Sequence, residues 1–253
     1  MPDFRVFCVP PATPPVTELV LSSEESHHLI VVNRARLGDP VVAFDGHGTE
    51  WFCTLTGNRK QAATLAVQTT RRAVPLPYAL TLAQALPKGA VMDDIVRQAT
   101  ELGVARILPL CSERSQVHLD DHRQDRKVGK WQTTALEAAK QCGNPWLPEI
   151  ASPASLAHVL AAATDCELLL VASLQPGAHS LKTALADFRA GHGRPPANVL
   201  WLVGPEGDFS PAEMQLLQAR GVVPITLGPL VLRCDTAAVC ALSLLGYELQ
   251  NQP

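Results

Sequence analysis

Two charged side chains near the end of the chain have the types and spacing for acid–base chemistry. Arg233 and Asp235 lie two positions apart in the segment LVLRCDTA, directly before an apolar run that predicts a helix. A carboxylate can remove a proton or orient a substrate, and a guanidinium can stabilise negative charge on a substrate or bind a phosphate. Asp235 or Thr236 can also serve as a simple helix N-cap. We therefore take Arg233 and Asp235 as candidate catalytic residues, with capping as the alternative for Asp235.

A glycine-containing segment, GPEGDFS at residues 204–210, stands upstream of this pair. Ser210, Pro211 and Glu213 fit an N-cap, a proline in the first turn and a capping-box glutamate, so residues 204–209 form a short loop before a helix. Gly204 and Gly207 allow a ligand to approach the backbone, and a tight turn without a ligand is the alternative. The spacing matches neither the dinucleotide nor the triphosphate glycine motif.

Both segments follow apolar runs, which must position them. Residues 199–203 and 222–227 predict strands, so residues 198–249 contain a strand, a glycine loop and a helix twice. The carboxyl ends of strands in an open parallel sheet are where such folds bind ligands. The functional site is therefore expected in these two loops.

The remainder of the chain divides into two patterns. From residue 78 onward, predicted strands (78–86, 106–112, 167–173) alternate with helical spacing (92–102, 128–142, 154–163, 181–190), and the polar residues 113–126 predict an exposed loop. This alternation predicts an α/β domain with a largely parallel sheet over residues 75–253. Residues 1–74 instead show short strands and tight turns, with a hairpin turn at residues 45–48, and predict a small β-barrel. Pro75 and Pro77 mark the boundary.

Composition narrows the class of protein. With 47% hydrophobic and 18% charged residues the chain can bury a core, and no apolar run is long enough to cross a membrane. The net charge of −3 does not indicate a nucleic-acid binder, so any RNA contact must use a local patch. Seven scattered cysteines and the absence of a secretory signal pattern predict reduced thiols and a cytoplasmic location.

Other candidate sites are weaker. His118 and His122 have the spacing of a metal-binding pair on a helix, but they fall in a predicted loop without a third ligand, so no metal is expected. Ser22, Ser115 and Ser173 lack the G-x-S-x-G context of a hydrolase nucleophile. Glu206 and Asp235 can be imagined as a glycosidase pair, although nothing in the sequence fixes their separation.

The motifs taken together resemble a known family. The order GPEG-x-FS, then a glutamate, then LG-x-x-[IV]-LR-x-[ED]-TA is similar to the ribosomal RNA small-subunit uridine-N3 methyltransferases (RsmE type) of the SPOUT superfamily. Further matches follow in the family's order along nearly the whole chain: FRVF at 4–7, HHL at 27–29, PKG at 87–89, QATELGV at 98–104, ERS at 113–115 and EAAKQCG at 137–143.

This resemblance implies a PUA-like, RNA-binding β-barrel at residues 1–74 and a SPOUT methyltransferase domain with a trefoil knot at 75–253. It also implies S-adenosyl-L-methionine (SAM) as cofactor, a homodimer, and methylation of N3 of one uridine in 16S ribosomal RNA of the small ribosomal subunit. The residues expected to bind the cofactor are Val171, Ala172, Leu202, Val203, Gly204, Pro205, Glu206, Gly207, Leu227, Gly228, Val231 and Leu232. The cations in matched motifs, expected to bind RNA, are Arg5, Arg34, Arg36, Lys88, Arg97 and Arg114.

The chain departs from the family pattern at several positions near the expected site. The family usually has glycine where Asp208 stands, arginine where Leu230 stands and glutamate where Asp235 stands. The nearest alternative is a knotted methyltransferase that acts on transfer RNA or on a ribose 2′-hydroxyl. The departures also keep open a second alternative, a non-catalytic RNA-binding protein.

Overall fold

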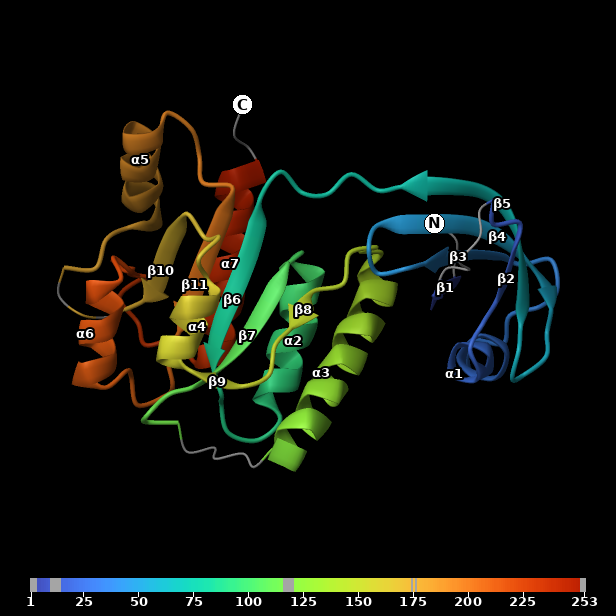
Figure 1. Ribbon diagram of the computed structural model, residues 1–253, viewed down its shortest axis with the longest axis horizontal. Coiled ribbons are helices and arrows are strands. Elements are labelled where there is room, and N and C mark those ends of the chain that lie inside the picture. Colours follow the sequence, from blue (N-terminus) through green and yellow to red (C-terminus); the bar gives the residue numbers. More distant parts are fainter. Residues whose placement is uncertain (1–3, 10–14, 116–120, 174, 176, 251–253) are drawn as a thin grey trace. The chain divides into compact units, whose positions relative to one another are not determined.

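The computed structural model describes residues 4–9, 15–115, 121–173, 175 and 177–250 of the chain (Figure 1). It contains two compact units, Met1–Pro75 with Leu136–Leu147, and Leu76–Ala135 with Pro148–Pro253. The long helix α3 (Asp121–Cys142) contributes its last turns to the first unit. A domain boundary after residue 74 stays a prediction.

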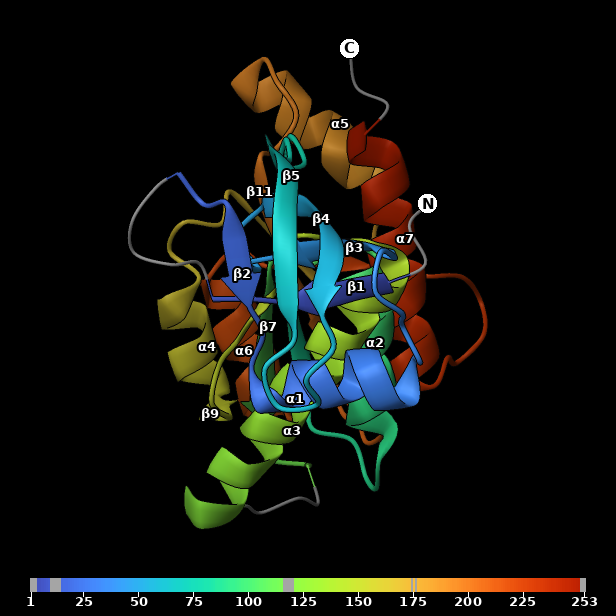
Figure 2. The same ribbon diagram turned by 90° about the vertical axis from the view of Figure 1, so that its right-hand side faces the viewer.

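The first unit is built on a five-stranded sheet with the strand order β1-β3-β4-β5-β2 (Figure 2). Its elements are β1 (Phe4–Phe7), β2 (Glu18–Val20), α1 (Ser23–His27), the π-helical turn η1 (His28–Val32), β3 (Pro40–Phe44), β4 (Thr49–Gly57) and β5 (Thr64–Arg72). The β1–β3 pair is parallel and the other pairs are antiparallel. Within the described residues no pairing joins β1 to β2, so the predicted small barrel is an open half-barrel.

Its core and its turn follow from the sequence pattern. Apolar side chains on one face, among them Val41, Leu55 and Leu65, are almost completely buried. The hairpin turn predicted at residues 45–48 is confirmed, because β3 and β4 pair on either side of it. The Asp45 carboxylate accepts hydrogen bonds from the backbone N–H groups of His47 (2.7 Å) and Thr49 (2.9 Å). Partial burial opposes ionisation, but bonds from Thr49 and His47 prevail and lower the pKa of Asp45.

The second unit is a parallel sheet with the order β12-β10-β11-β6-β7-β8, and β9 also pairs with β7. Its strands are β6 (Ala79–Ala85), β7 (Arg106–Cys111), β8 (Glu149–Ile150), β9 (Ala154–Ser155), β10 (Leu168–Ala172), β11 (Asn198–Val203) and β12 (Val223–Ile225). Its helices besides α3 are α2 (Val91–Glu101), α4 (Leu156–Ala162), α5 (Leu181–His192), α6 (Pro211–Ala219) and α7 (Cys234–Gln250). The prediction of a parallel α/β domain is confirmed.

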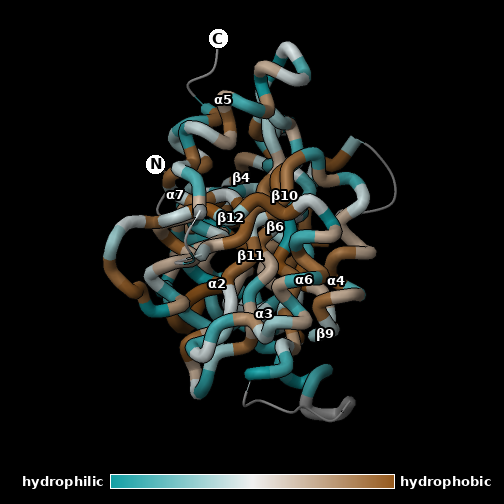
Figure 3. Tube along the Cα trace, turned by 90° about the vertical axis from the view of Figure 1, so that its left-hand side faces the viewer, coloured by the Kyte–Doolittle hydropathy of each residue, from teal (hydrophilic) through white to brown (hydrophobic). Residues whose placement is uncertain are grey.

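Helices cover both faces of this sheet. One buried cluster joins the sheet to α2, α3, α5 and α7, and a second joins its other face to α4 and α6. Strands buried on both faces require continuous apolar runs, as in LLLVA of β10 and NVLWLV of β11, and these appear brown in Figure 3. In the part of the chain that is described, no helix combines the length and the apolar character that a membrane crossing requires.

Two local predictions were wrong. Residues 121–126 belong to the first turns of α3 and not to a loop, because a polar, charged segment also suits the exposed start of a helix. Residues 154–155 pair with β7, so the helix predicted from 154 begins at Leu156, capped by Ser155. The short strands β2 and β8 were missed, since two or three residues carry no readable alternation.

Candidate functional site

A cavity of about 600 Å³ opens in the second unit, at the carboxyl ends of β10 and β11. Its volume lies within the usual range for small-molecule sites. The lining comes from the end of β10, the loop after β11, the loop after β12 and the start of α7. The two predicted glycine loops, which flank β10 in the sheet order, therefore meet at one cavity.

Most residues expected to bind the cofactor line this cavity. They are Ala172, Val203, Gly204, Pro205, Glu206, Gly207, Leu227, Val231 and Leu232. Val171 and Leu202 instead bury their side chains in the core cluster with α4 and α6. Gly228 has a φ of +122°, and its N–H donates to the Thr226 hydroxyl (3.2 Å). Cofactor binding by all of these residues stays a prediction.

The cavity is also lined by five residues that were not among the site residues predicted from the sequence. They are Ser173, Asp208, Leu230, Cys234 and Ala237. Four of them are next to a predicted site residue in the chain, and Ala237 lies two positions after Asp235. The signal that could have found them is the extent of the two loops. The first helical residues after a loop also belong to the wall.

The first wall is the loop 204–210, and its end is fixed in the core. Ser210 caps α6 with a complete capping box with Glu213, as predicted. Phe209 is buried, and its ring lies so close to Gly204 that a Cβ there would be 3.1 Å from it. A side chain at position 204 would therefore displace this ring, which explains the glycine.

Asp208 is an acidic residue in this loop, at a position where the family that the motifs resemble usually has glycine. Its φ is +60°, a left-handed conformation that glycine adopts without strain and that Asp and Asn adopt more readily than most residues. The Asp208 carboxylate accepts a hydrogen bond from the Phe209 N–H (2.8 Å) and one from the Gln175 side-chain amide (3.2 Å). These two bonds offset part of the backbone cost.

The second wall, residues 227–233, exposes large side chains, although Leu227 and Leu232 pack against the core. Leu230 is 72% and Val231 82% exposed, although both line the cavity. The side chain of Arg233 is 78% exposed and also faces the cavity. These apolar side chains lie in a loop, where no strand or helix buries them.

The two candidate catalytic residues lie at the start of α7. The Arg233 carbonyl accepts the first helical bond, from Ala237 N–H (2.8 Å), and α7 begins at Cys234. Asp235 thus lies within the first turn, and the N-cap alternative for Asp235 or Thr236 is wrong. Asp235 Oδ1 is buried and has no hydrogen-bond partner among the described residues; Arg233 Nε lies 3.6 Å from it, too far for a hydrogen bond. Arg233 lines the cavity, whereas Asp235 does not.

Burial raises the pKa of the Cys234 thiol, and the neighbouring carboxylates Glu206 and Asp235 raise this pKa further. A raised pKa keeps the thiol neutral, and the neutral thiol is a poor nucleophile. The direction of this pKa shift therefore does not favour Cys234 as a nucleophile.

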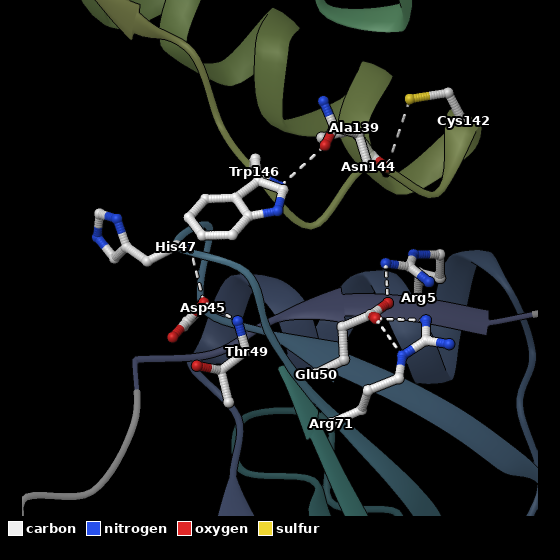
Figure 4. Close-up of polar contacts among 10 residues, drawn as sticks. All are labelled: Arg5, Asp45, His47, Thr49, Glu50, Arg71, Ala139, Cys142, Asn144 and Trp146. Atoms are coloured by element: carbon white, nitrogen blue, oxygen red, sulfur yellow. Dashed lines mark hydrogen bonds and ion pairs between the residues drawn. The ribbon is translucent and has the colours of Figure 1, made fainter. Parts of the chain in front are cut away.

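The cations expected to bind RNA have different surroundings. In the first unit Arg5 forms an ion pair with Glu50 (3.0 Å), a buried carboxylate that Arg71 also contacts (2.6 Å), as Figure 4 shows. Arg5 is therefore engaged in a structural network. Arg34 and Arg36 are exposed.

In the second unit Lys88 is exposed, and Arg97 pairs with Asp94 (3.1 Å) and Glu101 (3.5 Å) along α2. Arg114 donates a hydrogen bond to the backbone carbonyl of Gly207 (2.8 Å) in the first wall. RNA contacts by these residues stay predictions. Of the weak metal candidates, His118 lies outside the described residues, and nothing is described of the His122 side chain.

Comparison with known families identifies the two units. Residues 74–246 match the family of the RNA methyltransferase domain, and residues 21–67 match the RNA methyltransferase PUA domain. The ribosomal RNA small subunit methyltransferase E of Bacillus subtilis is 31% identical over 91% of this chain and 90% of its own length. The chain belongs to the ribosomal RNA small subunit methyltransferase E family. It is accordingly an RNA methyltransferase.

Two further relatives are similar to this chain over most of its length. The Synechocystis protein is 30% identical over 92% of this chain and 74% of its own length. A solved structure of a protein assigned as a methyltransferase from Legionella pneumophila, in complex with bound SAM, superposes with a TM-score of 0.85. It is 31% identical, over 97% of both chains. The half-barrel with a parallel α/β sheet is the arrangement typical of SPOUT methyltransferases; the trefoil knot stays a prediction.

Proposed function

We propose that this protein transfers a methyl group from SAM to N3 of one uridine in 16S ribosomal RNA. The observation that carries the proposal is the meeting of the two glycine loops and the Arg233 side chain at one cavity of the RNA methyltransferase domain. Support for SAM comes from the Legionella relative, which binds it and shares the fold over 97% of its chain.

The residues present fit SAM. The cavity of about 600 Å³ combines apolar walls with the exposed backbone of two glycine loops, which suits a ligand with an apolar ring face and polar edges. Glu206 and Asp208 line it and carry negative charge, which favours a cationic sulfonium over an anionic ligand. When bound, SAM supplies a methyl group that its sulfonium already activates.

The protein's own residues then have two tasks. Uridine N3 carries a proton at neutral pH, so a base must accept this proton or the resulting anion must be stabilised. Asp235 has a buried carboxylate oxygen without a hydrogen-bond partner in the described part of the chain, and we assign it the role of base or of orienting the uracil edge. Arg233, at the cavity, stabilises the negative charge that develops on the uracil carbonyls or binds an adjacent phosphate.

RNA binding is proposed for the half-barrel and for cations of the methyltransferase domain. Arg34, Arg36 and Lys88 are exposed and can reach phosphates without breaking an ion pair shown by the structure. Arg5 would have to leave the buried carboxylate of Glu50, so its contribution to RNA binding is expected to be smaller. Neutralising the exposed cations should flatten the salt dependence of RNA binding.

A homodimer is part of the proposal. Leu230, Val231, Leu244 and Tyr247 are large apolar side chains that are exposed on the second wall and on α7. Large apolar side chains that a single chain leaves exposed favour contact with a second copy of the chain. Sedimentation equilibrium measures the mass directly. A cytoplasmic location stays a prediction.

One experiment tests the reaction. The purified protein is incubated with small ribosomal subunits and methyl-labelled SAM, and the RNA is then digested and mapped by mass spectrometry. We expect a single methylated uridine in 16S RNA, with the label on N3. Label on a ribose 2′-hydroxyl, on transfer RNA alone, or on no RNA would contradict the proposal.

A further inference from the structure

A polar connection joins the loop after β7 to the loop after β11 in the second unit. In the sheet, β6 lies between these two strands, so the connection crosses the carboxyl end of β6. We propose that Arg114 is a positioning residue, which holds the backbone of the first wall in the conformation that binds SAM. The inference rests on the proposed function, because it assigns Arg114 to that cofactor site and not to RNA.

The Arg114 guanidinium contacts the wall at its midpoint. Its Nη1 donates to the Gly207 carbonyl at 2.8 Å, a charge-assisted bond. The aliphatic part of the side chain also lies against this glycine, because a Cβ at position 207 would be 3.7 Å from Arg114 Cβ. Gly207 itself lines the cavity.

This bond fixes a whole peptide group. The carbonyl of Gly207 and the N–H of Asp208 belong to one planar peptide unit. Arg114 binds the carbonyl, and the N–H donates to the Pro205 carbonyl at 2.9 Å. With both ends held, the plane cannot rotate without losing a hydrogen bond. The direction of the neighbouring backbone groups toward the cavity is thereby set.

The segment 112–113, which directly precedes Arg114, is itself held by hydrogen bonds. Glu213, only 6% exposed, accepts hydrogen bonds from the Ser112 hydroxyl (3.0 Å), the Glu113 N–H (3.0 Å) and the Ser210 N–H (2.9 Å). One buried carboxylate thus connects the loop after β7, at residues 112–113, to the start of α6. Arg114 is itself exposed, but it reaches the first wall from a segment that is held in a fixed position.

The test compares Arg114→Ala with Arg189→Ala. Both changes remove one arginine charge from the methyltransferase domain, but Arg189 is an exposed residue of α5 that belongs to no predicted site. We expect Arg114→Ala to raise the Kd for SAM in calorimetry about tenfold, the effect of one charge-assisted hydrogen bond. Arg189→Ala should leave this Kd unchanged. Arg114→Lys, which keeps a charged donor, should recover part of the affinity.

Steady-state kinetics separate positioning from RNA contact. With Arg114→Ala, the KM for SAM should rise while the KM for small subunits and the salt slope of RNA binding stay at the wild-type values. An unchanged SAM affinity with a flatter salt slope would overturn the inference and return Arg114 to the RNA-binding set. If Arg114→Ala does not fold, Arg114→Lys and Arg114→Gln carry the same comparison. A wild-type protein that binds no SAM would refute the proposed function itself, and with it this role.

Discussion

The two loops that form the cavity differ in how they are held. The loop 204–210 is fixed by the buried Phe209 ring, the capping box, the bond from Arg114 and the bonds to Asp208. The loop 227–233 exposes most of the side chains of Leu230, Val231 and Arg233. The hydrogen bonds that the structure shows for this loop are mainly the two between Thr226 and Gly228. Both loops follow strands of one parallel sheet, so the fold alone does not account for the difference.

The difference indicates a division of tasks. A wall that is fixed before a ligand arrives loses little conformational entropy on binding, which suits recognition of a cofactor through its backbone. An exposed wall with apolar side chains and a cation is suited to a large partner that covers it, such as RNA or a second subunit. The first loop is therefore expected to control cofactor affinity and stability, and the second loop and its junction with α7 to control the reaction.

The largest expected effect is on catalysis, at the junction between the second loop and α7. Asp235→Asn removes the proposed base while preserving the shape of the side chain. We expect the single-turnover methylation rate to fall by about 10²–10⁴-fold, the usual contribution of a positioned general base. SAM affinity and thermal stability should change little. Asp187→Asn on the exposed face of α5 is the control, and an unchanged rate with Asp235→Asn would remove Asp235 from the mechanism.

The next effect is on stability, in the first loop. Glu213→Ala leaves the Ser112 hydroxyl and the N–H groups of Glu113 and Ser210 without their common acceptor. We expect the free energy of unfolding to fall by about 2–4 kcal/mol, because buried donors without acceptors are costly. Urea denaturation measures this change. The control Glu149→Ala, on an exposed residue of β8, should stay within about 0.5 kcal/mol of wild type. If the two variants lose equal amounts of free energy of unfolding, the hydrogen bonds to Glu213 contribute nothing particular to stability.

Sequence reasoning predicted one of these loops better than the other. The first loop contains its own signals, because glycines, a cap, a proline and a glutamate act over short sequence distances. Its long-range supports were not predicted. The contacts from Arg114 and from Gln175 join residues that are 93 and 33 positions away in the chain, and no local pattern encodes such pairs.

Arg114 shows this limit most clearly, because the sequence gives the charge of a side chain but not its hydrogen-bond partner. Its assignment to RNA from a matched motif stays a prediction, whereas its bond to Gly207 was not predicted. The exposure of Leu230 and Val231 could not be predicted either. An apolar run predicts buried side chains, whether or not another part of the protein covers them. Sheet type and both strand–loop–helix units were predicted, since apolar periodicity alone determines them.

A smaller effect is expected at Asp208, where the backbone of the first loop is left-handed. Asp208→Ala removes the bonds to Phe209 N–H and Gln175 while keeping the unfavourable φ of +60°. We expect a loss of about 1–2 kcal/mol in the free energy of unfolding. Asp208→Gly loses the same bonds but relieves the strain, so it should lie within about 0.5 kcal/mol of wild type. A glycine variant that is less stable than the alanine variant would show that conformation does not govern this position.

The smallest effect on stability is expected in the second loop. Val231→Ser removes an apolar side chain that is 82% exposed, so folding buries little of it and the free energy of unfolding should change by no more than about 0.5 kcal/mol. If a second copy of the chain covers this wall, the same variant should weaken self-association in sedimentation equilibrium. Val41→Ser, at a buried position of β3, is the contrasting control and should destabilise strongly. A large loss of stability in monomeric Val231→Ser would mean that the second loop is as firmly packed as the first, and the division of tasks would fail.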